Sequence, residues 1–375
     1  MAGTGKTAIA WSICARVRAD DTLYLGDSFF CSRSTGSAAQ RDVRCVIPTL
    51  AQLLARQSDE FAAALAAELK EEPDLAYKQV KVQVGRLLRK PLAALSSSMK
   101  TIVFVVDALD ECSDQQNDTA VGNNLEAHAA VSGMFEALVD FFRSSTDLLI
   151  KFIVTSQPET HIREMSVTDS KITSALHLHT IDKSQVTSDI QLYISKTLYK
   201  PSDPDPWFTI GNVETLAERA DGLFIFAATA TKYILGGGKG LRVKRLTNLV
   251  SQLQTMPTGL VIAPLDLMYS SILTEASRSD MVEVDDLQQM LKVVAAILSA
   301  RMTLSVEALA ELLDLSTEYL RGCLHHLHTV AYLPEDNHDA GLRTLHASFG
   351  DYLLTRAAAD IRITATLGHY ELAHG

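Results

Sequence analysis

Short apolar runs alternate with helix-like segments over the first 180 residues of this 375-residue chain. The clearest run, TIVFVV at 101–106, is typical of a strand buried on both faces of a parallel sheet. Strands of this kind that alternate with helices predict an α/β fold, with a parallel sheet covered by helices on both faces. The predicted strands are 28–31, 101–106, 149–154 and 175–180.

The pattern changes at Asp182, after which leucines and other apolar residues recur at three- and four-residue spacing. This spacing predicts one amphipathic helix after another. The prolines at 201–206 predict a break, and the glycines at 236–240 are expected to cap a helix and form a loop. The predicted helices are 184–198, 214–235 (as two helices meeting near Gly222), 265–275, 284–300, 305–313 and 317–329.

Two short strand-like pieces, at 331–333 and 343–346, follow the last of these helices. Three helices and a hairpin in this arrangement suit a winged helix. The chain is therefore predicted to hold an α/β domain at 1–181, an all-helical domain at 182–257, and a winged-helix domain with the start of a C-terminal extension at 258–375.

A glycine-rich segment opens the chain and is followed by apolar residues at four-residue spacing, as in a helix with one buried face. It matches the phosphate-loop pattern G-x-x-x-x-G-K-[ST], whose first glycine would lie one residue before Met1. Backbone N–H groups of such a loop point at phosphate oxygens, while Lys6 reaches the outer phosphates and the Thr7 hydroxyl binds Mg²⁺. The predicted nucleotide-binding residues of the loop are Gly3, Thr4, Gly5, Lys6, Thr7 and Ala8.

An acidic segment, DALDE at 107–111, follows the predicted strand 101–106 directly. In phosphate-loop enzymes an aspartate at this position holds Mg²⁺, so Asp107 is the predicted metal ligand. A neighbouring carboxylate can orient or deprotonate the attacking water, and Glu111 and Asp110 are the candidate catalytic bases. The alternative is a solvated acidic turn after a core strand, which the glycine-rich segment upstream makes less favourable.

These motifs resemble the NACHT-type P-loop NTPases of the STAND class, and in particular fungal NLR-like proteins whose domain is also described as nephrocystin-3-like. The resemblance extends over nearly the whole chain. Its segments, in the family's order, are GTGKT at 3–7, SFFCSR at 28–33, PTLA at 48–51, DALDE at 107–111, VTSQPE at 154–159 with HIR at 161–163, ADGLFIFAA at 220–228, and LHASF at 345–349 with Asp351 and Tyr352.

The resemblance implies a molecular switch that binds ATP or ADP with Mg²⁺. In the ADP state three domains pack around the nucleotide, and exchange for Mg·ATP opens the protein and favours a homo-oligomer, with slow hydrolysis or none. Family members carry an effector segment before this region and a repeat sensor after it, and the chain contains neither. Immune or incompatibility signalling in the cytoplasm is the expected setting.

The resemblance also implies roles for Gln157 and His346. Gln157 stands where the family usually has an arginine that senses the γ-phosphate, and a neutral amide lacks that positive charge. Hydrolysis is therefore less expected than binding. His346 resembles the winged-helix histidine that contacts the β-phosphate of ADP; the alternative is a histidine that caps the helix starting near Ser348.

The composition and charge of the chain limit the kinds of partner that we expect it to bind. The formal charge is −11, from 34 basic and 45 acidic residues, which argues against a nucleic-acid partner. No apolar stretch approaches the roughly 20 residues of a membrane span, and the N-terminus lacks the features of a signal peptide. The five cysteines are scattered and lack CxxC spacing, as in reduced cytosolic thiols.

Two other functions remain open from the residues. A degenerate paralogue could keep the fold as an interaction scaffold and bind no nucleotide; the incomplete loop and Gln157 favour this alternative. A small-molecule kinase shares the phosphate loop, but no acceptor-pocket signature accompanies it. The residues do not decide between ATP and GTP.

Overall fold

The structure is a computed structural model. It describes residues 3–32, 38–95, 100–112, 124–143, 149–157, 173–199, 207–236, 238–255, 264–277, 284–300, 304–325, 327–332 and 341–355. The proline-rich segment at 201–206 and the HIR segment at 161–163 lie outside these ranges.

Contacts within the chain divide it into two compact units, which are described separately below. The first unit is Gly5–His177, and the second is Leu178–Gly375 together with Ala2–Thr4. The predicted domain boundaries at 181/182 and 257/258 stay predictions.

The first unit is a mixed α/β unit built on a parallel sheet. Among the described residues, its strands are β1 (Leu23–Phe30), β2 (Thr101–Asp107) and β3 (Ile150–Val154), paired in the order β1-β2-β3. The pairing of β1 shifts register between Leu25 and Asp27. A Cβ at the intervening Gly26 would lie 2.6 Å from a ring carbon of Phe104, so the bulge needs a glycine.

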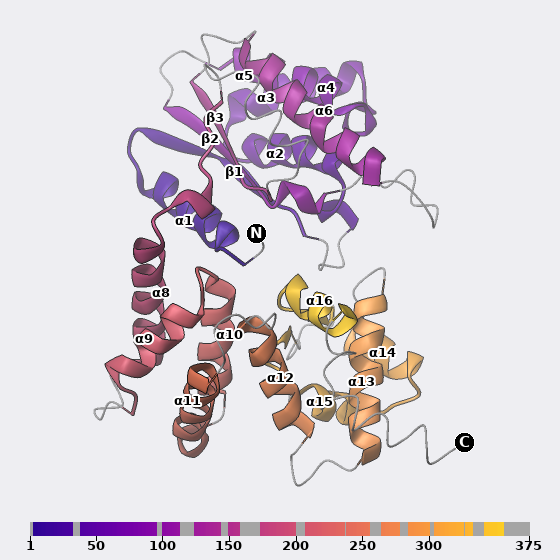
Figure 1. Cartoon of the computed structure of the whole chain (residues 1–375). Coiled ribbons are helices and arrows are strands. Elements are labelled where there is room, and N and C mark those ends of the chain that lie inside the picture. Colours follow the sequence, from indigo (N-terminus) through magenta and orange to yellow (C-terminus); the bar gives the residue numbers. More distant parts are fainter. Residues whose placement is uncertain are drawn as a thin grey trace. The chain divides into compact units, whose positions relative to one another are not determined.

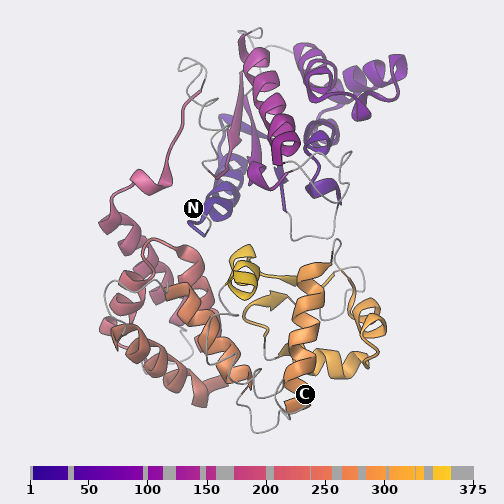
Figure 2. The same cartoon turned by 45° about the vertical axis from the view of Figure 1, so that its right-hand side comes forward.

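Helices cover both faces of this sheet (Figures 1 and 2). On one face, α1 (Lys6–Ala19) buries Ala10, Cys14 and Val17 against Val103 and Val105 of β2. The other face carries Ile102, Phe104 and Val106, which belong to a larger core with α2 (Val46–Ala55) and α6 (Asn124–Arg143). The alternation of side chains along a strand thus sends successive β2 residues into two separate cores.

The remaining helices of the first unit contribute to the same core. They are α3 (Asp59–Glu71), α4 (Val80–Gln83), a π-helical turn (Val84–Arg89) and α5 (Lys90–Ala93), with short 3₁₀ turns at Ala38–Gln40, Val43–Cys45, Leu75–Tyr77 and Leu109–Glu111. Examples of the residues that they bury there are Phe61 of α3, Leu88 of the π-helical turn and Leu92 of α5.

Among its described residues, the second unit is helical apart from one short antiparallel strand pair. Helix α10 contacts α8, α11 and α12, and its residues from Phe226 to Ile234 are almost all buried. The elements are α8 (Lys183–Leu198), α9 (Ile210–Arg219), α10 (Phe224–Leu235), α11 (Gly238–Thr255), α12 (Pro264–Ser277), α13 (Val284–Ser299), α14 (Val306–Leu312), α15 (Thr317–His325), β4 (Ala331–Tyr332), β5 (Arg343–Thr344) and α16 (Ala347–Thr355), after a 3₁₀ turn at Leu178–Thr180.

Most predicted elements are confirmed, and four differ: two strands, one helix and one loop. The helix predicted at 317–329 ends at His325, and residues 327–330 form turns. The strand predicted at 28–31 begins at Leu23, because the chain continues its pairing with β2 through the bulge at Gly26. The strand predicted at 175–180 is wrong: 173–177 have no regular structure, and Leu176 is 77% exposed. A strand needs a neighbour to satisfy its backbone groups, and no described segment pairs with this one.

The glycines at 236–240 form less of a loop than expected. Gly236 ends α10, but α11 already begins at Gly238. Burial of Leu246, Leu249 and Leu253 on one face of α11 outweighs the low helix propensity of its first residues. Among the described helices, none has both the length and the apolar character that crossing a membrane requires.

We predict that the sheet core depends on Phe104, which is fully buried and stacks on Phe152 with ring centroids 4.9 Å apart. Phe104→Ala should destabilise the first unit by about 3–5 kcal/mol, because it removes buried apolar surface and leaves a cavity. Hydrogen exchange of the β1 and β2 amides measures the loss. Tyr77→Ala, at a residue 85% exposed, is the control and should stay within about 0.5 kcal/mol. Equal effects of the two substitutions would contradict the assigned core.

Candidate functional site

The glycine-rich segment turns directly into α1. Gly5 has a φ of +89°, in the left-handed region that glycine adopts without strain, and α1 begins at the next residue, Lys6. The Ile9 N–H donates to the Gly5 carbonyl at 3.0 Å, which closes the first turn. Thr7 and Ala8 are exposed, and no side chain caps this helix end. A positive helix terminus of this kind favours an anion.

Gly3 also requires glycine. Its φ is +78°, and a Cβ added there would lie 2.3 Å from the Cγ2 atom of Ile225. The Gly3 carbonyl accepts a hydrogen bond from the Ile225 N–H at 3.1 Å, within the first turn of α10. Gly3 and Thr4 group with the second unit by these contacts, whereas Gly5 and Lys6 group with the first.

Asp107 is the last residue of β2 and is 1% exposed. The hydroxyl of Thr155, which follows β3, donates to Asp107 Oδ1 at 2.5 Å and accepts from the Ala108 N–H at 3.0 Å. Ala108 has a φ of +51°, so the chain turns sharply behind the carboxylate. Thr155 thereby fixes both the side chain of Asp107 and the turn that follows it.

Asp110, in the turn that follows β2, makes a second contact, with the residues that follow β3. Its Oδ1 accepts from the Gln157 N–H at 2.8 Å and from the Ser156 hydroxyl at 3.2 Å. Asp110 is 6% exposed, while Glu111 is half-buried at the end of the same 3₁₀ turn. The two candidate bases therefore differ in their surroundings. Asp110 is the more buried of the two, and its carboxylate binds the backbone N–H of Gln157.

Two buried thiols lie beside these strand ends. The Cys31 N–H donates to the Asp107 carbonyl at 3.0 Å, and the Sγ atoms of Cys31 and Cys112 are 3.0 Å apart. The hydrogen bond with Cys112, together with burial and the negative charges of Asp107 and Glu111, raises the pKa of the Cys31 thiol. Cys31 therefore stays a neutral thiol, and none of the five cysteines, all of which lie in the described ranges, forms a disulfide.

Thr155 and Ser156 were not among the residues predicted from the sequence. A signal was present, since both are polar and follow directly on the predicted strand 149–154. Ligand sites in parallel sheets lie outside the carboxyl ends of the strands, so polar residues there are candidates by position.

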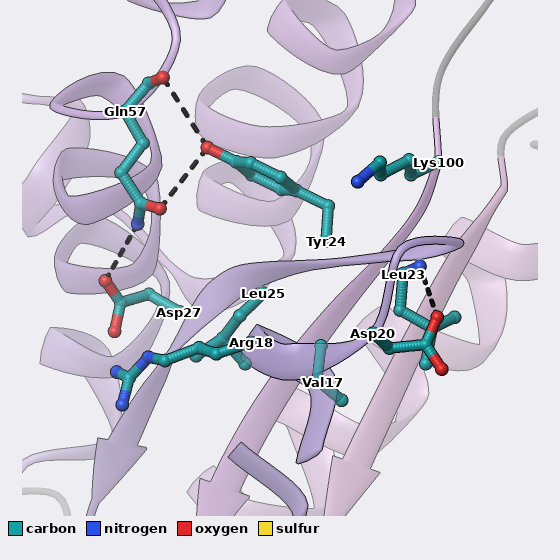
Figure 3. A pocket seen from close by; sticks show the side chains of 9 residues that line it. All are labelled: Val17, Arg18, Asp20, Leu23, Tyr24, Leu25, Asp27, Gln57 and Lys100. Atoms are coloured by element: carbon teal, nitrogen blue, oxygen red, sulfur yellow. Dashed lines mark hydrogen bonds between the residues drawn. The ribbon is translucent and has the colours of Figure 1, made fainter. Parts of the chain in front are cut away.

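A cavity of about 390 Å³ lies elsewhere in the first unit, around the start of β1 (Figure 3). Both carboxylates that line it already accept hydrogen bonds from neighbouring residues. Asp20 accepts them from the Thr22 and Leu23 N–H groups, and Asp27 accepts one from the Gln57 side chain. Asp107 and Gln157 lie at the opposite, carboxyl ends of β2 and β3, and α1 reaches the cavity with Val17 and Arg18 of its last turn rather than with Lys6. The cavity is therefore no part of the candidate nucleotide site.

His346 lies in the second unit, immediately before α16. The Ser348 N–H donates to His346 Nδ1 at 3.1 Å, which is the hydrogen bond of a helix cap. The capping alternative for this histidine is thus realised in the structure, and its contact with a nucleotide stays a prediction.

The oxygen donors at the site fit Mg²⁺. Among the described residues no group of three metal-ligating side chains occurs, which excludes an all-protein cage in that part of the chain. Mg²⁺ needs only one or two protein oxygens, because phosphates and waters fill the other positions. The Asp107 carboxylate and the Thr7 hydroxyl supply oxygens of this kind.

Comparison with known families bears on this region. Residues 1–157 match the family model described as Nephrocystin 3, N-terminal. The match supports a NACHT-like N-terminal region and spans the glycine-rich segment, all three strands and Gln157. A comparison with curated proteins found no significant match.

Within this nephrocystin-3-like region, we predict that the Thr155 hydroxyl holds the strand ends together. Thr155→Val should destabilise the first unit by about 1–3 kcal/mol, because it leaves the Ala108 N–H and the buried Asp107 carboxylate without this partner. Thr155→Ser keeps the hydroxyl and should retain most of the stability. Thermal unfolding with hydrogen exchange at the Ala108 amide measures both, and a larger loss in Thr155→Ser than in Thr155→Val would show that the methyl group matters instead.

Proposed function

We propose that this chain is the nucleotide-binding core of a STAND-type, NACHT-class molecular switch that binds ATP and ADP with Mg²⁺. The observation that carries the proposal is the pairing of two motifs in one α/β unit. The left-handed Gly5 leads into α1, and α1 packs on β2, the strand that ends in Asp107. A phosphate loop and a metal-binding aspartate are the two parts that such a site needs.

Residues of the loop would bind the phosphates. Backbone N–H groups from Gly3 to Ala8 and the positive end of α1 attract the anion, while Lys6 neutralises the outer phosphates. Thr7 and Asp107 would hold Mg²⁺, which when bound neutralises charge between the phosphates. Thr155 would keep the Asp107 carboxylate oriented through its 2.5 Å hydrogen bond.

Of the two candidate bases, Glu111 suits the role better than Asp110. Asp110 Oδ1 already accepts two hydrogen bonds from Ser156 and Gln157, so moving it would release the end of β3. Gln157 offers no positive charge to a γ-phosphate. Slow turnover, or none, follows from these two features, and binding rather than hydrolysis would set the state of the switch.

The second unit would report that state. We propose that α8–α11 form the helical domain and that α13–α16 with the β4-β5 pair form a winged helix, in which His346 contacts the β-phosphate of ADP. A nucleotide shifts an equilibrium only by its differential affinity, and a near-complete shift needs about 5.5 kcal/mol. Exchange of ADP for Mg·ATP would supply this difference and favour self-association.

The biological setting follows the resemblance to fungal NLR-like proteins. It would be immune or incompatibility signalling in the cytoplasm. A fold-retaining scaffold that binds no nucleotide is the competing function, and the first experiment below separates the two.

We predict that Lys6→Ala weakens binding of fluorescent ADP and Mg·ATP by about ten- to hundredfold, because one charge-assisted contact to phosphate contributes about 1.5–3 kcal/mol. Equilibrium titration by fluorescence anisotropy measures the change. Lys196→Ala, at an exposed lysine of α8, is the matched control and should bind as the parent does. Absence of saturable binding by the parent chain would favour the scaffold.

We also predict that Gln157→Arg raises the preference for ATP over ADP by about tenfold or more, because a guanidinium at this position pairs with γ-phosphate oxygens. The hydrogen bond from residue 157 to Asp110 is made by the backbone and survives the substitution. The ratio of the two dissociation constants is the measurement. Gln157→Lys tests whether charge alone suffices, and an unchanged ratio in both variants would place residue 157 away from the γ-phosphate.

A further inference from the structure

His328 packs on the end of α10. It is half-buried in the turn at 327–330, between α15 and β4. A Cβ added to Gly236, the residue that caps α10, would lie 2.3 Å from His328 Nε2 and 3.0 Å from His328 Cε1. The imidazole ring therefore lies directly against the Gly236 backbone, so that it connects this turn with α10.

One hydrogen bond determines which ring nitrogen carries the proton of neutral His328. Nδ1 lies 2.7 Å from the His325 carbonyl oxygen. A carbonyl can only accept, so Nδ1 donates, and Nε2 has a lone pair and no proton. Among the residues that the structure describes, none makes a hydrogen bond with Nε2, which faces Gly236. Protonation of the ring would therefore add a positive charge and a donor without a partner among them.

The charged groups that act on His328 are positive. They belong to Lys232 of α10, Arg245 of α11 and, when it is protonated, His325 of α15. Neither α10 nor α11 contains an aspartate or a glutamate. Glu275 of α12 pairs with Arg245 at 2.8 Å, so its charge is already balanced. A protonated ring would thus meet like charges on three helices.

These surroundings favour the neutral ring. Burial lowers the pKa of His328, the hydrogen bond to the His325 carbonyl opposes this, and the three positive groups lower it further. Between the folded pKa and the usual value of about 6.5, the unfolded chain binds a proton that the folded chain does not. The free energy of unfolding therefore rises with pH across this window. The contribution of His328 is complete above about pH 6.5 and is lost as the pH falls through the folded pKa.

We propose that His328 is an acid-sensitive contact of the second unit, which holds the turn at 327–330 against α10 while the ring is neutral and weakens when the ring is protonated. Helix α10 belongs to the predicted helical domain at 182–257, and the turn belongs to the predicted winged-helix domain at 258–375. Acidification below about pH 6.5 therefore loosens the contact between these two parts, with or without a nucleotide.

The first test is an NMR titration of the full chain labelled at histidine, with His328 assigned by the loss of its signal in His328→Asn. The pKa of His328 should lie below about 6.5. Lys232→Gln should raise it, because the substitution removes a neighbouring positive charge and leaves a polar side chain. A pKa at or above about 6.5 in the parent chain, or no rise in Lys232→Gln, would overturn the proposal.

The second test measures the contact itself, by hydrogen exchange of the amides from Tyr233 to Gly236 at the end of α10. Their protection factors are corrected for the intrinsic pH dependence of exchange. Between about pH 7.5 and about pH 5.5 they should fall about three- to tenfold more in the parent chain than in His328→Asn. The asparagine amide can donate to the His325 carbonyl in place of Nδ1 but takes up no proton in this range. Equal falls in the two proteins would contradict the proposal.

The matched control is His179→Asn, which replaces an exposed histidine of the same unit and should keep the pH dependence of the parent chain. The same loss of pH dependence in this control would show that the effect is not specific to His328. If His328→Asn does not fold, Lys232→Gln takes its place, and an undiminished fall of protection in that variant would contradict the proposal. Neither test contains a nucleotide, so the outcome is independent of the proposed function.

Discussion

Reciprocal hydrogen bonds between the ends of β2 and β3 are the constraint on which the candidate site depends. The Thr155 hydroxyl holds the Asp107 carboxylate, and the Asp110 carboxylate in turn holds the backbone of Gln157. Both carboxylates are almost fully buried, where a missing partner costs far more than the bond itself contributes. The two strand ends therefore keep one geometry, which a binding site built from separate strands requires.

A backbone N–H also holds a side chain in the second unit. There the Ser348 N–H at the start of α16 donates to His346 Nδ1, and Ser348 Oγ lies within hydrogen-bond distance of both His346 Nδ1 and the Tyr269 hydroxyl. In both units a backbone N–H, which can only donate, bonds a side-chain atom that could either donate or accept, and so determines that this atom accepts. The hydrogen bonds that these side chains can make therefore depend on the backbone contacts as well as on the residue types.

Glycine has a specific use at three positions of the nephrocystin-3-like region. Gly3 and Gly5 adopt positive φ, and Gly26 lets the bulge in β1 approach Phe104. Gly3 and Gly5 allow the left-handed backbone before α1, and Gly26 leaves room for the Phe104 ring beside the bulge. Alanine at Gly3 would meet the side chain of Ile225, so this position is constrained by packing as well as by conformation.

The sequence by itself determined the parallel α/β unit, most helices of the second unit, and the two motifs at Lys6 and Asp107, because burial periodicity and turn chemistry are local properties. Only the tertiary structure separated Asp110 from Glu111 and revealed Thr155, because these roles depend on hydrogen bonds between residues of different elements. The strand predicted at 175–180 fails for the same reason. Its apolar pattern is local, but a strand exists only where another backbone pairs with it.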